Sequence, residues 1–276
     1  MYTYKVKHLM EKIMSKIKMI AVDMDGTFLN GQMEYDRHRF WKLFKIMKQR
    51  DIKFVVASGN QYYQLISFFE NRDNEMMFVA ENGSYISEYG KAIKVTEFSV
   101  KAKQSILEFV RNKDELINVF CAKDRAYMLT NPERKSFIGQ WYHRLEEVSS
   151  FDLITDAMIK FNINCKDEDT YRYIDLIRQS LPAEVDAVTS GHGSIDLIVR
   201  GCHKAFGLKL LADKYGISAD EMIVFGDGGN DIEMLKMAKY SYAMENAPKN
   251  VKESAKFIAP SNEDQGVLTT LEQLLF

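Results

Sequence analysis

The chain has 276 residues, a formal net charge of −2 at pH 7 and 46% hydrophobic residues, which allows one large or two modest globular domains with a sizeable core. Without a basic excess, nucleic acid is not an expected partner. No run approaches the ~20 apolar residues that cross a bilayer, and residues 1–18 lack the apolar stretch and cleavage site of a secretory signal. Three cysteines without C-x-x-C spacing fit a reducing, cytoplasmic location.

A short apolar run at residues 19–22 ends in two carboxylates, Asp23 and Asp25, which are followed by Gly26 and Thr27. This pattern predicts a buried strand that breaks into a turn. The carboxyl end of a central parallel strand opens into the crevice where such folds bind ligands. Two acids there suit a hard cation such as Mg²⁺, or a nucleophile beside an acid/base. The alternative is a turn in which an aspartate merely caps the next helix.

Helix and strand patterns then alternate. The expected helix, strand, helix and strand cover residues 35–50, 52–57, 61–71 and 76–80. This alternation predicts a parallel, doubly wound sheet. Small polar residues follow both strands: Ser58, Gly59 and Asn60 after the first, Asn82 and Gly83 after the second. The Ser58 hydroxyl and the first amides of the next helix could together hold an anion.

The middle of the chain has a different character. Short alternating runs, typical of strands, occupy residues 85–87, 93–98, 117–122, 126–129, 159–164, 185–188 and 194–199. Helix-like stretches between them occupy residues 102–111, 134–147 and 169–181. This pattern predicts an α+β module with a largely antiparallel sheet. We expect it to be inserted at residues 86–190 between two parts of a core, residues 19–85 and 191–276, with residues 1–18 as an extension.

After Lys204 the first pattern resumes. The expected helices lie at 205–215, 232–238 and 266–276, and the strands at 222–225, 240–244 and 256–258. The first of these strands ends in a glycine-bearing turn that contains Asp227, Asn230 and Asp231. If it lies beside the strand that ends at Asp23, four acids could share one hard cation. Mg²⁺, Lys204 and neutral donors such as Ser58 would then suit a phosphate group.

Four ordered motifs resemble those of the haloacid dehalogenase superfamily: D-M-D-G-T at 23–27, S-G-N at 58–60, the lysine at 204 and G-D-G-G-N-D at 226–231. The long insertion is similar to the C2-type cap of the Cof-type phosphatase branch. The segments V-A-S-G-N-Q-Y-Y-Q-L at 56–65 and V-A-E-N-G at 79–83 are similar to those of bacterial sugar phosphatases. The likeness implies an α/β fold with a Rossmann-like parallel-sheet core and an inserted α+β cap that selects substrate.

The resemblance also implies roles for individual residues. Asp23 would attack phosphorus and form an aspartyl phosphate, while Asp25 would protonate the leaving oxygen and later activate water. Mg²⁺ would be held by Asp23, the Asp25 carbonyl and Asp227. Asp231 would not bind the ion itself but would orient its water ligands or Lys204. The phosphoryl oxygens would be bound by Ser58, Gly59, Lys204 and Asn230.

Substrate contacts are expected from Asn60 and Asn82. Many relatives carry Arg or Lys where this chain has Asn60, so a charge near the substrate is missing. Turn residues are the alternative interpretation for Asn82 and Asn230, and an ordinary loop residue is the alternative for His203. We expect hydrolysis of a small phosphomonoester, a sugar phosphate first, and a flavin or pyridoxal phosphate as the alternative. Phosphotransfer to a second substrate and a non-catalytic phosphometabolite sensor are rival functions, and neither a protein partner nor a membrane is implied.

Overall fold

A computed structural model describes residues 14–191 and 193–276, so most of the predicted extension at residues 1–18 lies outside the described part. The chain divides into two compact units. The first consists of the described residues up to Ser58 together with Leu208–Phe276, and the second is Gly59–Gly207. In the described part, no helix is both long and apolar enough to cross a membrane.

The first unit is built on a parallel sheet. Its strands are β1 (Met19–Val22), β2 (Lys53–Ala57), β12 (Met222–Gly226), β13 (Tyr240–Met244) and β14 (Phe257–Ala259), in the order β14-β13-β12-β1-β2. Each neighbouring pair among them is parallel. All four side chains of β1 are buried, as expected for a strand covered on both faces. The predicted doubly wound core is therefore present here, and β1 lies directly beside β12.

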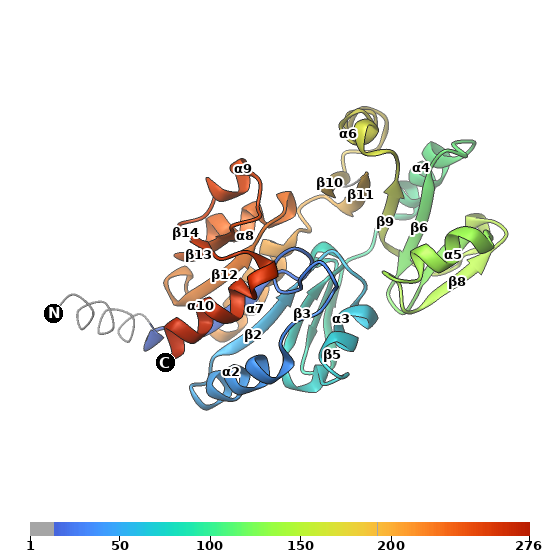
Figure 1. The fold of residues 1–276 in the computed structure, drawn as a ribbon. Coiled ribbons are helices and arrows are strands. Elements are labelled where there is room, and N and C mark those ends of the chain that lie inside the picture. The colour runs from blue at the N-terminus through green and yellow to red at the C-terminus, as the bar shows by residue number, and fades with distance from the viewer. Residues whose placement is uncertain (1–13, 192) are drawn as a thin grey trace. The chain divides into compact units, whose positions relative to one another are not determined.

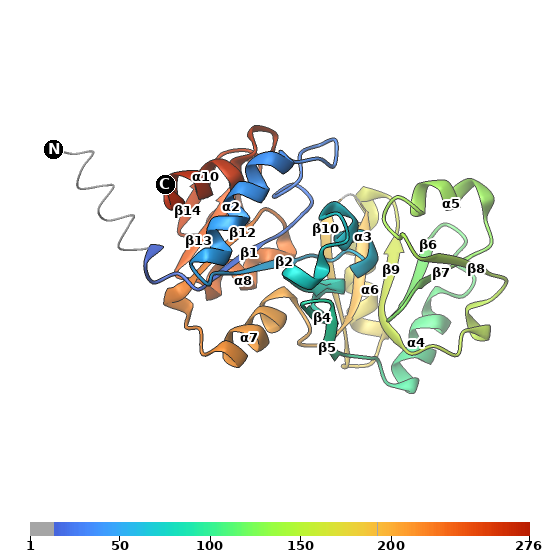
Figure 2. The same cartoon turned by 90° about the horizontal axis from the view of Figure 1, so that it is seen from below.

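Helices cover this sheet (Figures 1 and 2). They are α2 (Arg37–Gln49), α7 (Lys204–Tyr215, which crosses from the second unit), α8 (Ile232–Met237), α9 (Lys249–Lys252) and α10 (Gly266–Leu275), with short 3₁₀ turns η5 (Ala219–Glu221), η6 (Gly229–Asp231) and η7 (Asn262–Asp264). Helix α10 packs against α2, where Arg39 donates two hydrogen bonds to the Glu272 carboxylate. Helix α8 packs against β12 and β13, so its amino end lies just beyond the end of β12.

The second unit begins with α3 (Tyr62–Phe68), η1 (Asp73–Glu75), β3 (Met77–Ala80) and the turn η2 (Glu81–Gly83). Strand β3 pairs antiparallel with β4 (Tyr85–Glu88), which pairs with β5 (Lys91–Val95). Residues 85–87 and 93–98 were expected to belong to the inserted module. The tight η2 turn folds the chain straight back along β3, so β4 and β5 extend the pairing of β3, and their place in the inserted module stays a prediction.

A separate six-stranded sheet makes up the rest of this unit in the described part, in the order β10-β11-β9-β6-β7-β8. Its strands are β6 (Ile117–Ala122), β7 (Ala126–Leu129), β8 (Leu145–Val148), β9 (Met158–Asn164), β10 (Val185–Gly191) and β11 (Ser194–Val199). Pairing is antiparallel except between β7 and β8. Helices α4 (Val100–Val110) and α6 (Thr170–Ser180) bury their apolar faces with one face of the sheet in a common core (Figure 2).

One predicted helix is wrong in its second half. The stretch 134–147 forms the short helix α5 (Pro132–Ile138) and then β8. The helix begins at Pro132 after its cap Asn131 and ends at Gly139, whose N–H donates to the Lys135 carbonyl at 2.8 Å. Residues after it gain backbone partners by pairing with β7, and that tertiary pairing overrides the helical preference of the Arg and Glu residues. The predicted boundaries of the insertion, 86 and 190, stay a prediction.

Candidate active site

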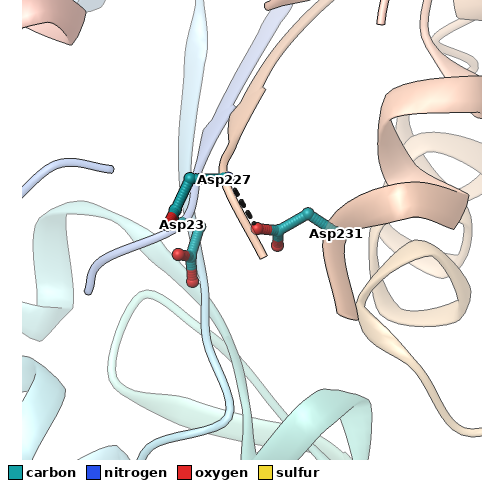
Figure 3. Close-up of side chains that lie close together, drawn as sticks. All are labelled: Asp23, Asp227 and Asp231. Carbon is teal, nitrogen blue, oxygen red and sulfur yellow. Dashed lines mark hydrogen bonds between the residues drawn. The ribbon is translucent and has the colours of Figure 1, made fainter. Parts of the chain in front are cut away.

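Three aspartates of the first unit converge where β1 and β12 end. Asp23, Asp227 and Asp231 each offer one carboxylate oxygen, and these oxygens lie within 4.8 Å of one another. Figure 3 shows Asp23 and Asp227 at the ends of neighbouring strands, with Asp231 reaching toward them from the following turn. Carboxylate oxygens are the ligands that a hard divalent cation prefers. The donor set therefore fits Mg²⁺.

Strand pairing explains why Asp23 and Asp227, which are 204 residues apart in the sequence, meet. Strands β1 and β12 are parallel neighbours in register, with Val22 opposite Phe225. The Asp23 N–H donates to the Phe225 carbonyl at 3.1 Å, so the two chains stay paired up to the first acid. Asp23 is buried, with 6% of its surface exposed. The predicted cation site required these two strands to be neighbours, and they are.

Asp231 holds the turn that carries Asp227. Its Oδ2 accepts hydrogen bonds from the backbone N–H of Asp227 at 2.9 Å and of Gly228 at 2.8 Å. The side chain is fully buried, in the turn η6 that leads into α8. These two amide donors fix the orientation of the carboxylate. Asn230 lies half-buried in the same turn.

The segment after Asp23 is a turn closed on one carbonyl, since the N–H groups of Thr27, Phe28 and Leu29 all donate to Met24 O. Asp25 stands half-buried within it. The next helix, α2, is capped by a different residue. Asp36 accepts a hydrogen bond from the Arg39 N–H at 3.0 Å, so the alternative in which this segment only caps the following helix is wrong.

Two residues of the first motif hold Asp227, and the sequence had given them no role. The Thr27 hydroxyl donates to Asp227 Oδ1 at 2.6 Å and is buried. Gly26 has φ +73°, and a Cβ placed on it would stand 2.4 Å from Asp227 Oδ2. The Asn246 side chain donates to the Gly26 carbonyl at 2.8 Å. A threonine directly after an Asp-Gly pair was the signal available in the sequence.

Ser58 is buried at the end of β2 in the first unit. Gly59, Asn60 and Asn82 belong to the second unit, where they contact one another. The Asn60 carbonyl accepts from the Glu81 N–H at 3.1 Å. A Cβ on Gly59 would stand 3.0 Å from Asn82 Nδ2, a tighter contact than most side chains make, so glycine gives that amide room. Asn82 has φ 52° and ψ 32°, a left-handed conformation that asparagine tolerates, so it is a turn residue at the least.

Lys204 is the first residue of α7 and is buried, with 1% of its surface exposed. Two glycines of the second unit set the position of this helix end. A Cβ on Gly83 would stand 2.5 Å from the His203 carbonyl, and one on Gly207 would stand 2.4 Å from a methyl group of Val79. The His203 ring accepts a hydrogen bond from the Phe206 N–H at 3.2 Å. His203 therefore serves the start of the helix, which agrees with its interpretation as an ordinary loop residue.

The structure thus brings the predicted residues together in two sets. Asp23, Asp227 and Asp231 form one in the first unit, and Gly59, Asn60 and Asn82 form the other in the second. The joining of the two sets around one phosphate stays a prediction. The second set also includes polar residues of β9 and β11 that the sequence analysis did not single out, chief among them the buried Lys160 and the partly buried Asp196.

Comparisons with known proteins agree with this geometry. Residues 20–271 match the family described as haloacid dehalogenase-like hydrolase. The chain is 45% identical over 261 residues to the 5-amino-6-(5-phospho-D-ribitylamino)uracil phosphatase YbjI of Escherichia coli K12, which covers 94% of this chain and 96% of that protein. A crystal structure from Streptococcus mutans UA159 is 36% identical, with a TM-score of 0.89 and coverage of 94% and 99%. The HAD subclass IIB sugar phosphatase BT4131 has the same fold, at 19% identity, a TM-score of 0.80 and coverage of 94% and 100%.

Proposed function

Because the chain belongs to the haloacid dehalogenase-like hydrolases, we propose that it is a Mg²⁺-dependent phosphatase that hydrolyses small phosphomonoesters through an aspartyl phosphate. The observation that carries the proposal is the convergence of the Asp23, Asp227 and Asp231 oxygens within 4.8 Å. One acid of such a group can attack phosphorus while the others hold the cation that offsets their charge.

In the first half-reaction, an Asp23 carboxylate oxygen attacks phosphorus and forms a P–O bond to the protein. The ester P–O bond on the opposite side breaks, and its electron pair goes to the leaving oxygen. Asp25, two residues further on and half-buried, donates its proton to that oxygen. The products of this step are the free alcohol, phosphorylated Asp23 and an ionised Asp25.

In the second half-reaction, the Asp25 carboxylate takes a proton from a water molecule as the water oxygen attacks phosphorus. The bond between phosphorus and the Asp23 oxygen breaks. Inorganic phosphate leaves, and both aspartates return to their starting protonation states. The same residue acts as acid and then as base because its proton is used in one step and regained in the next.

The cation site uses Asp23, the Asp25 backbone carbonyl and Asp227, with Asp231 keeping the Asp227 turn in place. Mg²⁺ bound there neutralises phosphoryl oxygens and lowers the repulsion that a dianionic substrate meets at a carboxylate nucleophile. Thr27 and Gly26 support this site, one by a hydrogen bond to Asp227 and the other by leaving it space.

Phosphoryl oxygens are bound by the Ser58 hydroxyl, the Gly59 amide, the Lys204 ammonium and Asn230. The two remaining predicted residues, Asn60 and Asn82, contact the rest of the substrate. Lys204 is buried at the start of α7, and its ammonium group is of the kind that binds phosphoryl oxygens through charge-assisted hydrogen bonds.

The substrate we propose is 5-amino-6-(5-phospho-D-ribitylamino)uracil. Support comes from the 45% identity, nearly end to end, to an Escherichia coli protein named for that phosphatase activity. Sugar phosphates, the first expectation from the sequence, stay a prediction, because the similarity to a sugar phosphatase is at 19% identity and concerns the fold. Both kinds of molecule are polyhydroxylated phosphomonoesters.

The reaction is tested by following release of inorganic phosphate with Mg²⁺ and with EDTA. Activity should require Mg²⁺, and Asp23→Asn should reduce it to background. Asp220→Asn is the matched control, since Asp220 is an exposed aspartate of the same unit that pairs with Lys239, and it should keep wild-type kcat/KM. Unchanged turnover in Asp23→Asn would contradict the assigned nucleophile, and binding without any turnover would favour a sensor.

The substrate is tested by comparing kcat/KM for the ribitylaminouracil phosphate, glucose 6-phosphate, flavin mononucleotide and pyridoxal phosphate. We expect the first to exceed the others at least tenfold. A higher value for any of the other three would replace the proposed substrate and leave the mechanism in place. Release of the dephosphorylated alcohol without an equal amount of inorganic phosphate, with the phosphoryl group recovered on an added alcohol acceptor, would instead indicate phosphotransfer.

A further inference from the structure

Strand β9 of the second unit carries a buried lysine in an unusual place. Its side chains alternate, so Phe161 and Ile163 belong to the apolar core of the unit, while Lys160 and Asn162 lie on the opposite face of the sheet. The Lys160 side chain is only 2% exposed. Because burial of an ammonium group is costly without partners, this lysine should have a specific task.

The contacts of Lys160 converge on the segment that follows Ser58. Its ammonium donates to the Gly59 carbonyl at 2.6 Å and pairs with Glu81 Oε2 at 2.8 Å. The Glu81 N–H in turn donates to the Asn60 carbonyl at 3.1 Å. The carbonyls of two successive loop residues are therefore held. Lys160 holds that of Gly59, and Glu81, its ion-pair partner, holds that of Asn60.

A second carboxylate completes the surroundings of the ammonium group. Asp196 Oδ1 lies 3.6 Å from Lys160 Nζ, and its two oxygens accept from Asn162 Nδ2 at 2.8 Å and Asn82 Nδ2 at 2.6 Å. Burial lowers the pKa of Lys160, but the Asp196 and Glu81 carboxylates outweigh this effect and hold that pKa well above its usual value. Lys160 is charged at neutral pH.

Holding a carbonyl also orients the amide on the other side of the same peptide bond. A trans peptide is planar, so its N–H points away from its C=O. Because Gly59 O is held against Lys160, the Asn60 N–H points away from the ammonium group. Because Asn60 O is held by the Glu81 N–H, the Gln61 N–H points away from Glu81. These are backbone donors within three residues of Ser58, whose hydroxyl we assign to the phosphoryl group.

We propose that Lys160 is a positioning residue for phosphate binding: from the six-stranded sheet it holds the Gly59–Asn60 peptide in the orientation that presents its amide to the phosphoryl oxygens. The inference rests on the proposed phosphatase function, because it needs a phosphate beside Ser58. The sequence motifs supply residues 58–60, 204 and 230 to the phosphate site. The inference adds Lys160, which lies outside those motifs, as a residue that positions this site.

The test uses Lys160→Met, which keeps most of the length of the side chain and removes the charge and the donor. This variant leaves the Glu81 carboxylate buried without its cation and should lose stability. The double variant Lys160→Met/Glu81→Gln removes that buried charge and should recover part of the melting temperature. It still lacks the donor to Gly59, so its Kd for inorganic phosphate in the presence of Mg²⁺ should stay weaker than wild type by about ten- to a hundredfold, the effect of a misplaced binding group.

Lys103→Met is the matched control. Lys103 also donates from its ammonium to backbone carbonyls of the second unit, those of Ile154 and Asp156 at 2.7 and 3.1 Å. Its loss should affect the melting temperature and leave phosphate affinity and KM unchanged. A purely structural role for Lys160 would give the double variant the same result as this control.

Phosphate binding is measured by calorimetry, which separates this inference from the proposed reaction. If wild type binds phosphate with a dependence on Lys160 but turns over no phosphomonoester, the inference stands and the phosphatase proposal fails. If the folded double variant binds phosphate as tightly as wild type, the positioning role of Lys160 is refuted. If wild type itself does not bind phosphate, the positioning role of Lys160 falls, and the phosphatase proposal is decided by the turnover assay alone.

Discussion

Replacing Gly26 with alanine should displace the Asp227 carboxylate and weaken Mg²⁺ binding. The new Cβ would stand 2.4 Å from Asp227 Oδ2, whereas ordinary contact begins at 3.4 Å. The carboxylate must therefore move by about 1 Å, a misplacement that can cost roughly a hundredfold in rate. Such a move also strains the 2.6 Å hydrogen bond from Thr27.

The substitution has a second cost that must be separated from the first. Gly26 has φ +73°, and alanine in this left-handed conformation lowers the free energy of unfolding by about 1–2 kcal/mol. In a chain of this size each kcal/mol lowers the melting temperature by about 2–4 °C, so we expect a loss of a few degrees. Gly216→Ala is the matched control. Gly216 has φ +62°, and no heavy atom of the described residues lies within 4 Å of its added Cβ, so this variant should lose stability alone.

The assay is the Mg²⁺ concentration that gives half-maximal phosphatase activity, measured alongside thermal melting with and without Mg²⁺. We expect Gly26→Ala to need at least tenfold more Mg²⁺ and to lose the stabilisation that Mg²⁺ gives wild type. The control should resemble wild type in both respects. If Gly26→Ala and Gly216→Ala share the same Mg²⁺ dependence, the assignment of Asp227 to the cation is wrong.

Two further predictions concern hydrogen bonds of the first unit. Thr27→Val removes the donor to Asp227 and should weaken Mg²⁺ affinity about tenfold, since a hydrogen bond to a charged group is worth about 1.5–3 kcal/mol. Thr27→Ser keeps the hydroxyl donor and should keep the Mg²⁺ affinity of wild type. Equal affinities in the two variants would show that this hydrogen bond does not support the site. Glu221 has its pKa lowered to about 2 by Lys18 and by the Ser218 N–H. Its contribution to stability should be complete above its ordinary pKa of 4.5 and be lost as the pH falls toward 2, so the difference in melting temperature between wild type and Glu221→Gln should shrink over that range.

Much of the first unit followed from local pattern. Apolar runs that end abruptly in Asp or Ser predict buried parallel strands, and β1, β2 and β12 lie where the pattern placed them. The sequence analysis could not predict that β1 pairs with β12 and only assumed it, because nothing in the sequence of either strand indicates which strand lies beside it. The structure confirmed that assumption, and with it came the grouping of Asp23 with Asp227.

The second unit was harder to predict because its elements depend on distant partners. Residues 145–148 carry a helical composition and become an edge strand through pairing with β7. Strands β4 and β5 follow β3 through a turn with two left-handed residues, Glu81 and Asn82. Asn82 and Gly83 marked a turn in the sequence, but the local pattern did not reveal that the chain then pairs back along β3.

Lys160 illustrates a signal that was present and overlooked. Residues 158–164 read M-I-K-F-N-I-N, and strict alternation places the lysine and two asparagines on one face. A polar face on a central strand, one between β11 and β6, indicates buried partners. Which partners these are, here Gly59 and Glu81, depends on how the chain returns from residue 81 to residue 160 and could not be read from the pattern.

The central claim is that Asp23 becomes phosphorylated during turnover, and trapping that species tests it most directly. Enzyme mixed with substrate and Mg²⁺ is quenched in acid within one turnover, and the peptide that contains Asp23 is examined by mass spectrometry. The account predicts one added phosphoryl group on Asp23, which is absent from Asp23→Asn. A phosphoryl group on another residue, or rapid product release with Asp23 never modified, would contradict it.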